Sequence, residues 1–182
     1  MLKKINNPIL KNILEWALAV VIALFVFWML IGFVARPARV FGTSMESTYF
    51  DGDRVIVNRL TFRFREPVFG DIVAFPSVDN PSQNYIKRVV GLPGDTIDIR
   101  RGRITINGEV LDDIRFRDVH NVFAGNVHFP MTLGDDYYFV LGDNLPISED
   151  SRLNTVGNVH IDNIIGRVNF RFFPFNRFGF VE

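Results

Sequence analysis

The chain contains no cysteine, and only three of its 182 residues are histidine. Without cysteine there is neither a disulfide framework nor a thiolate site, which fits a domain outside the cytoplasm. The positions of His120, His128 and His160 match no common zinc-binding pattern. We therefore expect no bound metal, and no motif in the chain predicts a cofactor.

Net charge is absent as well, because 20 basic side chains balance 20 acidic ones. The basic residues are scattered, whereas proteins that bind nucleic acid usually carry a basic patch or stripe. We expect no nucleic acid partner. Apart from one long apolar segment, the length suits a single domain with a substantial core.

The long apolar segment runs without a charged side chain from Trp16 to Ala35, and three lysines precede it. As a helix, about 20 residues at ~1.5 Å each span the ~30 Å core of a bilayer. A cleavable signal peptide is the alternative, but its apolar core is usually only ~7–15 residues long. We interpret residues 1–35 as a cytoplasmic N-terminal end and a transmembrane anchor. The lysines favour this orientation slightly, which places residues 36–182 on the outer face of the plasma membrane.

Beyond Pro37 the apolar residues come in short alternating runs bounded by Gly, Pro, Asn and Asp, a pattern typical of strands and turns. The segment 98–105 and the pair Asn107-Gly108 predict tight hairpin turns, and residues 112–134 are expected to be irregular. The predicted fold class is a mainly β domain of antiparallel strands behind one N-terminal transmembrane helix. The predicted strands are 54–58, 71–75, 85–90, 96–100, 103–106, 137–141 and 166–173.

The region 170–180 is rich in phenylalanine. The alternation of residue types through 168–172 favours a strand that packs into the core, and an edge that touches the membrane is the alternative.

Ser44 follows the apolar segment closely and is the candidate nucleophile. A serine hydroxyl needs a nearby base to become reactive at neutral pH. Lys87 is the candidate base, because Ile86, Val89 and Val90 place apolar residues on both faces of its predicted strand. A lysine with a pKa of ~10.4 is neutral in only about 0.04% of molecules at pH 7, and burial can lower that pKa by ~3–5 units. Taken singly, each residue has an ordinary alternative, a turn serine and a solvated strand lysine.

The segment 142–152 begins with Gly-Asp-Asn and carries a second serine, Ser148, followed by the charged pair Asp150 and Arg152. These side chains are suited to holding a lysine in place. Their ordinary alternative is a charged loop, since Gly, Asp and Asn begin many turns.

Together these segments resemble the type I signal peptidases, which are membrane-bound serine proteases with a Ser/Lys dyad. The resemblance covers nearly the whole chain, and the matching motifs come in the family's order. They are the single anchor, Ser44-Met45, residues 70–73, residues 85–95, Gly142-Asp143-Asn144 with Ser148, residues 150–152 and residues 164–167.

The resemblance implies that Ser44 is the nucleophile and Lys87 the general base. Ser148 would hydrogen-bond and orient the lysine amine, and Asp150 with Arg152 would support that loop. Tyr85, which opens the lysine motif, is a further supporting residue. Gly42 stands where some members have a serine that contributes to the oxyanion hole. In this chain, backbone N–H groups, including that of Ser44, would hold the oxyanion.

Some positions depart from the family's pattern. Ser47 stands where a proline is usual and Tyr49 where a leucine is usual, which questions the shape of the loop after Ser44. Asn84 and Leu145 replace an aspartate and an arginine that are often found there. None of these changes removes a catalytic group.

The implied function is that of a serine endopeptidase, a signal peptidase I, that removes signal peptides from exported preproteins by cutting after small residues. Its partners would be secretory preproteins and membrane lipid. The alternative is a non-catalytic, membrane-anchored β-module that binds exported or envelope partners. A chain whose Ser44 or Lys87 could be replaced without loss of its cellular role would belong to that second class.

Overall fold

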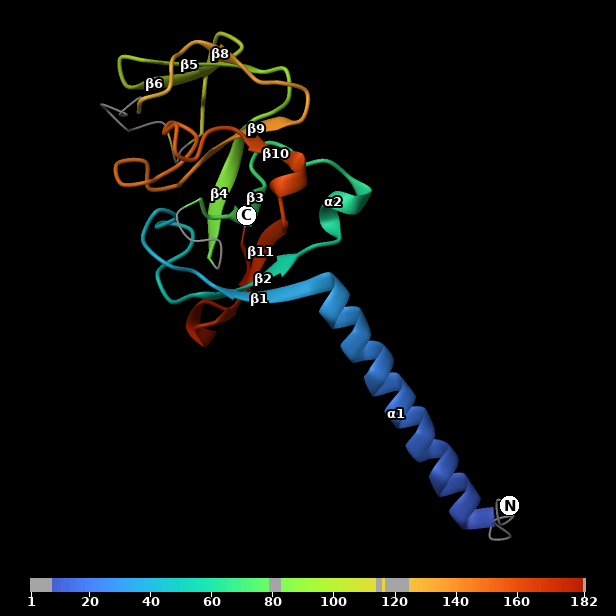
Figure 1. Cartoon of the computed structure of the whole chain (residues 1–182). Helices are drawn as coiled ribbons and strands as arrows, with labels where there is room; N and C mark the ends of the chain where they lie inside the picture. The colour runs from blue at the N-terminus through green and yellow to red at the C-terminus, as the bar shows by residue number, and fades with distance from the viewer. Residues whose placement is uncertain (1–7, 79–82, 114–115, 117–124, 182) are drawn as a thin grey trace.

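The computed structural model describes residues 8–78, 83–113, 116 and 125–181. A long helix, α1 (Pro8–Val34), extends away from a β-rich body (Figure 1). Its segment Pro8–Met29 is long and apolar enough to cross a membrane, and the most apolar part of it is not buried against the rest of the protein. The helix ends one residue before the predicted apolar segment does, and Ala35 already pairs with Asn58 as part of a strand.

An antiparallel sheet of eight strands forms the larger part of the body, in the order β1-β2-β11-β3-β4-β9-β10, with β12 paired to β11. β1 follows α1 directly and lies at one edge, so the helix joins the sheet without a loop. The strands are β1 (Ala35–Arg39), β2 (Arg54–Asn58), β3 (Ile72–Pro76), β4 (Asn84–Gly91), β9 (Tyr137–Leu141), β10 (Val159–His160), β11 (Gly166–Phe173) and β12 (Gly179–Phe180).

A smaller sheet lies at the end of the body remote from α1 (Figure 1). It has the order β7-β6-β5-β8, formed by β5 (Thr96–Arg100), β6 (Arg103–Ile106), β7 (Glu109–Val110) and β8 (Met131–Thr132). Arg101-Gly102 and Asn107-Gly108 connect its hairpins, and all four residues have positive φ. Two-residue hairpin turns of this kind match the twist of the paired strands, so both predicted turns are confirmed.

All the predicted strands are present, with bounds that differ by at most one residue at either end, and the mainly β, antiparallel fold class is confirmed. The sequence patterns did not indicate β1, the two-residue strands, or the short helices α2 (Thr61–Phe64), η1 (Ile161–Asn163) and η2 (Phe175–Arg177). β8 lies inside the segment 112–134 that was expected to be irregular. Residues 114–115 and 117–124 of that segment lie outside the described residues.

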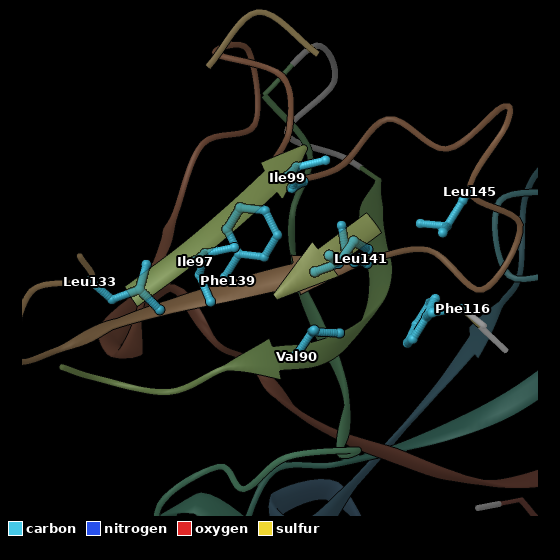
Figure 2. Packing of buried hydrophobic residues seen from close by; sticks show 9 residues of the cluster. Val90, Ile97, Ile99, Phe116, Leu133, Phe139, Leu141 and Leu145 are labelled. Carbon is cyan, nitrogen blue, oxygen red and sulfur yellow. The ribbon is translucent and has the colours of Figure 1, made fainter. Parts of the chain in front are cut away.

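The buried hydrophobic residues form three clusters. One fills the space between the two sheets, where Phe139 and Leu141 of β9 and Val90 of β4 pack against Ile97 and Ile99 of β5 (Figure 2). Alternate side chains of a strand point to the same face, which is why these positions share one layer. This packing fixes the end of β9 from which the loop 142–152 begins.

A second cluster secures the loop that follows Ser44. Met45 and Tyr49 are both buried there, with exposed fractions of 1% and 0%. The hydroxyl of Tyr49 donates to the carbonyl oxygen of Val168, and burial raises the pKa of this phenol. The tyrosine that departs from the family's leucine therefore still serves as a core anchor for the loop.

The phenylalanine-rich tail divides into two parts. β11 lies between β2 and β3 in the sheet and its Val168 is fully buried, so the predicted core strand is confirmed for its first half. The core-packing interpretation is wrong for the residues that follow, because Phe175, Phe178 and Phe180 are 81%, 58% and 78% exposed. β11 ends at Phe173, and the aromatic side chains that follow it lie at the surface.

Candidate active site

Ser44 and Lys87 lie together although 43 residues separate them in the chain. Ser44 belongs to the loop between β1 and β2, and Lys87 lies in β4. The Nζ atom of Lys87 is 2.7 Å from the Oγ atom of Ser44, a hydrogen-bond distance. Lys87 is only 2% exposed, and among the described residues no carboxylate lies within ion-pair distance of its amine. The pair has the geometry that a nucleophile and its base require.

Burial lowers the pKa of Lys87 to about 8 because it removes water from the charged amine. The negative charges of Asp150 and Glu149 oppose this shift but do not cancel it. With a pKa near 8, roughly a tenth of the lysines are neutral at pH 7, against about 0.04% for an ordinary lysine. The apolar environment thus makes a free amine available to take a proton.

Ser148 lies close to this pair but does not make the hydrogen bond expected of it. Its Oγ atom is buried and has no hydrogen-bond partner among the described residues. Its position is fixed by close packing, because a Cβ atom built on Gly142 would lie 2.2 Å from Ser148 Oγ and 2.4 Å from the carbonyl oxygen of Ser44. Only a glycine at position 142 lets the two serines approach each other this closely.

Asp150 and Arg152 form a buried ion pair, with Arg152 Nε 2.7 Å from Asp150 Oδ1. The second carboxylate oxygen of Asp150 accepts a hydrogen bond from the N–H of Gly142. Arg152 also donates to the carbonyl oxygens of Leu145 and Ser148. The pair therefore links both ends of the loop 142–152, as expected for residues that support it.

Asn144 joins this loop to the nucleophile loop, a role that the sequence patterns did not indicate. Its backbone N–H donates to the carbonyl oxygen of Ser44 at 3.0 Å, and its side-chain amide donates to that of Thr43 at 3.1 Å. The motif Gly-Asp-Asn was noticed, but the sequence does not say which segment its amide would bind.

Thr48, Arg88 and Asp143 form a second contact that sequence reasoning missed. Arg88 donates two hydrogen bonds to the carboxylate of Asp143, at 2.9 and 2.7 Å, and a third to the carbonyl oxygen of Gly70. The hydroxyl of Thr48 donates to the same carboxylate. The residue next to Lys87 therefore connects β4, the nucleophile loop and the loop after β9.

Gly42 has a φ of +78°, and its N–H donates to a side-chain oxygen of Asp51. A Cβ atom there would meet nothing within 4 Å, so the space is open and only the backbone conformation favours glycine.

Ser47, two residues after Met45, has a φ of +88°. A proline ring fixes φ near −65°, so the loop adopts a shape that the family's usual proline could not.

A narrow cleft runs beside the dyad. One wall comes from Val40, Phe41 and Met45, and the other from residues 84–87 of β4. A wider hollow of about 200 Å³ adjoins it and is lined by residues 37–39 that follow the helix, together with Phe41, Asn84 and Ile86. β9 pairs only with the far part of β4, from Arg88 to Gly91. The cleft therefore lies beside β4 where β9 no longer accompanies it.

The absence of a metal site stays a prediction. Within the part of the chain that the structure describes, no three His, Asp or Glu side chains are grouped to hold a metal ion. His120 lies outside the described residues.

Comparisons with known proteins agree with these features. The model of the family "Signal peptidase, peptidase S26" matches residues 13–173. A signal peptidase IB from Staphylococcus aureus is 31% identical, over 92% of this chain and 93% of its own length. A signal peptidase I from Leptolyngbya laminosa is 37% identical, over 97% of this chain and 85% of its own length. The structure of a signal peptidase I from Enterococcus faecalis, 32% identical, aligns with 57% of this chain and 97% of its own, with a TM-score of 0.43. By the extent of the family match and by these relatives, the chain belongs to the S26 family of signal peptidases.

Proposed function

We propose that Ser44 and Lys87 are the catalytic residues with which this serine endopeptidase of the signal peptidase family removes signal peptides from secretory preproteins. The observation that carries the assignment is the 2.7 Å distance between Lys87 Nζ and Ser44 Oγ in a buried setting. A lysine with a pKa of about 8 supplies a neutral amine at physiological pH.

In the first step the neutral amine of Lys87 accepts the proton of the Ser44 hydroxyl while Oγ bonds to the carbonyl carbon of the scissile peptide bond. The carbonyl electron pair moves onto its oxygen, which the backbone N–H of Ser44 stabilises. The C–N bond then breaks, and the Lys87 ammonium gives its proton to the leaving amine. An ester between Ser44 and the signal peptide remains.

Hydrolysis of this ester follows the same steps, with water as the nucleophile in place of Ser44. Lys87, neutral again, takes a proton from the attacking water and later returns it to Ser44 Oγ as the carboxylate product leaves. Ser148 packs beside the Ser44 backbone, and the Asp150–Arg152 pair holds the loop that carries Ser148. Tyr85 places its ring 5.5 Å from Lys87 Nζ and helps to keep the amine away from water.

The anchor places this chemistry at a membrane. Residues 1–35 form the cytoplasmic end and the transmembrane helix, and residues 36–182 form the catalytic domain on the outer face of the plasma membrane. The exposed apolar side chains of α1, among them Trp16 and Trp28 at 73%, are suited to contact with lipid. No nucleic acid takes part. Enzyme and preprotein, both held in the bilayer, meet at a raised effective concentration.

The cleft beside Ser44 receives the residues before the cut as an extended strand. Alternate side chains of such a strand point the same way, so the first and third residues before the scissile bond face one wall. The cleft beside Ser44 has a volume of only about 30 Å³, which supports the preference for small side chains such as alanine that the family resemblance implies.

The test is to incubate the detergent-solubilised full chain with a preprotein and to sequence the new N-terminus. Cleavage after a small residue that follows the apolar core, and none with Ser44→Ala, is the expected result. A folded, active preparation that cuts efficiently with Phe or Lys just before the scissile bond would overturn the proposed specificity. Binding of the preprotein without any cleavage by the wild-type chain would favour the non-catalytic β-module.

A further inference from the structure

Glu149 is an exposed carboxylate between two buried residues, Ser148 and Asp150. The loop on either side of it is held by Arg152, which donates to the carbonyl oxygen of Ser148 and pairs with Asp150. The backbone at Glu149 is therefore fixed, and its side chain extends away from the protein core. The hydroxyl of Tyr85 lies 3.4 Å from Glu149 Oε2 and can donate to it.

Tyr85 places this carboxylate beside the dyad. Its ring lies 5.5 Å from Lys87 Nζ, and the residue also lines the cleft at Ser44. Two other carboxylates are close to the site, Asp143 and Asp150, but both are buried and each is paired with an arginine. Glu149 is thus a carboxylate near Ser44 that remains accessible to a substrate.

The direction of the substrate decides what Glu149 can touch. The hollow lined by residues 37–39 leads from the cleft toward the end of α1. A signal peptide is held in the membrane by its apolar core, so the residues before the cut enter from that side. If the residues after the cut leave past Ser44 and Lys87, they pass Tyr85 and the Glu149 carboxylate that its hydroxyl contacts.

We propose that Glu149 is a specificity-determining residue that selects, by charge, the residues of the preprotein that directly follow the scissile bond. A basic side chain there is favoured and an acidic one is disfavoured. This inference rests on the proposed function. One exposed charge pair of this kind changes a rate by at most about fivefold, so a ratio between basic and acidic substrates, which combines attraction and repulsion, is about three to ten. Salt weakens the effect because screening at 0.15 M acts over ~8 Å.

The experiment uses the detergent-solubilised full chain and two peptide substrates that differ only in carrying Lys or Asp at the first or second position after the cut. The measured quantity is the ratio of kcat/KM for the Lys peptide to that for the Asp peptide. Both values come from one enzyme at one pH, so any change in the pKa of Lys87 cancels. The variants are Glu149→Gln and Glu149→Lys, with Glu109→Gln as the matched control, because Glu109 is an exposed carboxylate on the smaller sheet.

We expect a ratio of about three to ten for the wild-type chain at low salt, near one for Glu149→Gln and below one for Glu149→Lys. The control should keep the wild-type ratio. A wild-type ratio that Glu149→Lys leaves unchanged would overturn the inference while leaving the peptidase intact. Failure of the wild-type chain to cut either peptide, or a preprotein supplied beside them, would count against the proposed function itself.

Discussion

Lys87 and Arg88 are neighbours on β4, and the fold buries both cations, with exposed fractions of 2% and 1%. Their surroundings differ completely. Arg88 meets both oxygens of the Asp143 carboxylate and the carbonyl oxygen of Gly70. Lys87 meets the neutral hydroxyl of Ser44. A buried charge costs several kcal/mol unless it is paired. The Asp143 carboxylate compensates the charge of Arg88, whereas burial drives Lys87 toward its neutral form.

The comparison shows how one strand combines a structural cation with a chemical base. Successive residues of a strand point to opposite faces, so the two side chains enter separate environments. Arg88 joins β4 to Thr48 and Asp143 and so holds the loops that carry Ser44 and Ser148. Arg88 thus provides the stabilising contacts, and Lys87 needs no carboxylate partner among the described residues.

The largest effect should follow from removal of the dyad. Ser44→Ala and Lys87→Ala are each expected to lower kcat by about 10⁴-fold or more, because members of a cooperating unit lose function together. The double variant should be no worse than either single one. Single-turnover kinetics on a peptide, with circular dichroism as the control for folding, measures this. A double variant that is far slower than both singles would show that the two residues act independently.

Breaking the structural pair should cost stability. Arg88→Met leaves the Asp143 carboxylate buried without its arginine, and we expect the free energy of unfolding of the outer domain to fall by about 3–5 kcal/mol. Arg100→Met is the matched control, since its exposed pair with Asp98 is worth at most about 1 kcal/mol. Urea denaturation compares the two. Equal losses in both variants would mean that Arg88 is not the structural cation we describe.

Replacing Lys87 should raise the free energy of unfolding, whereas replacing Arg88 lowers it. A lysine whose pKa falls from 10.5 to about 8 on folding costs stability below pH 8, and the cost disappears as pH rises through 10.5. Lys87→Met should therefore be inactive yet more stable than the wild type by about 2–3 kcal/mol at pH 6. Denaturation at several pH values measures the difference. A difference that grew with rising pH would contradict the assigned shift.

Ser148→Ala should produce the smallest change. Alanine keeps the Cβ atom that packs against Gly142 and loses only a hydroxyl that has no partner among the described residues. We expect kcat to fall by at most about tenfold, the size of one ordinary hydrogen bond. Steady-state kinetics on the same peptide suffices. A variant as inactive as Ser44→Ala would place Ser148 in the chemistry itself.

The sequence predicted the strands well where side chains alternate between core and solvent, as in β2, with Val55 and Val57 buried. It did not predict β1, because Arg36, Pro37 and Arg39 carry no such alternation and the strand forms only by pairing with β2. Strands of two residues are too short to show an alternation of buried and exposed side chains.

For the site, the apolar residues of β4 around Lys87 made it a candidate base for Ser44, and the roles of both residues came from the resemblance to the signal peptidases. The contacts of Thr48 with Asp143 and of Asn144 with Thr43 were not predictable. The first contact joins residues 95 positions apart and the second joins residues 101 positions apart, and only the tertiary fold brings them together. The tail after β11 was predicted incorrectly because period-2 alternation does not show where a sheet ends.

The central claim is that burial turns Lys87 into a base, and the pH dependence of kcat/KM tests it most directly. The profile should be flat above an inflection near pH 8, the lowered pKa of Lys87, and should fall about tenfold per pH unit below it. Because kcat/KM reports on the free enzyme, a substrate without titrating groups leaves Lys87 as the group that sets this limb. A kcat/KM that stayed constant down to pH 6 would contradict a lysine base at this site.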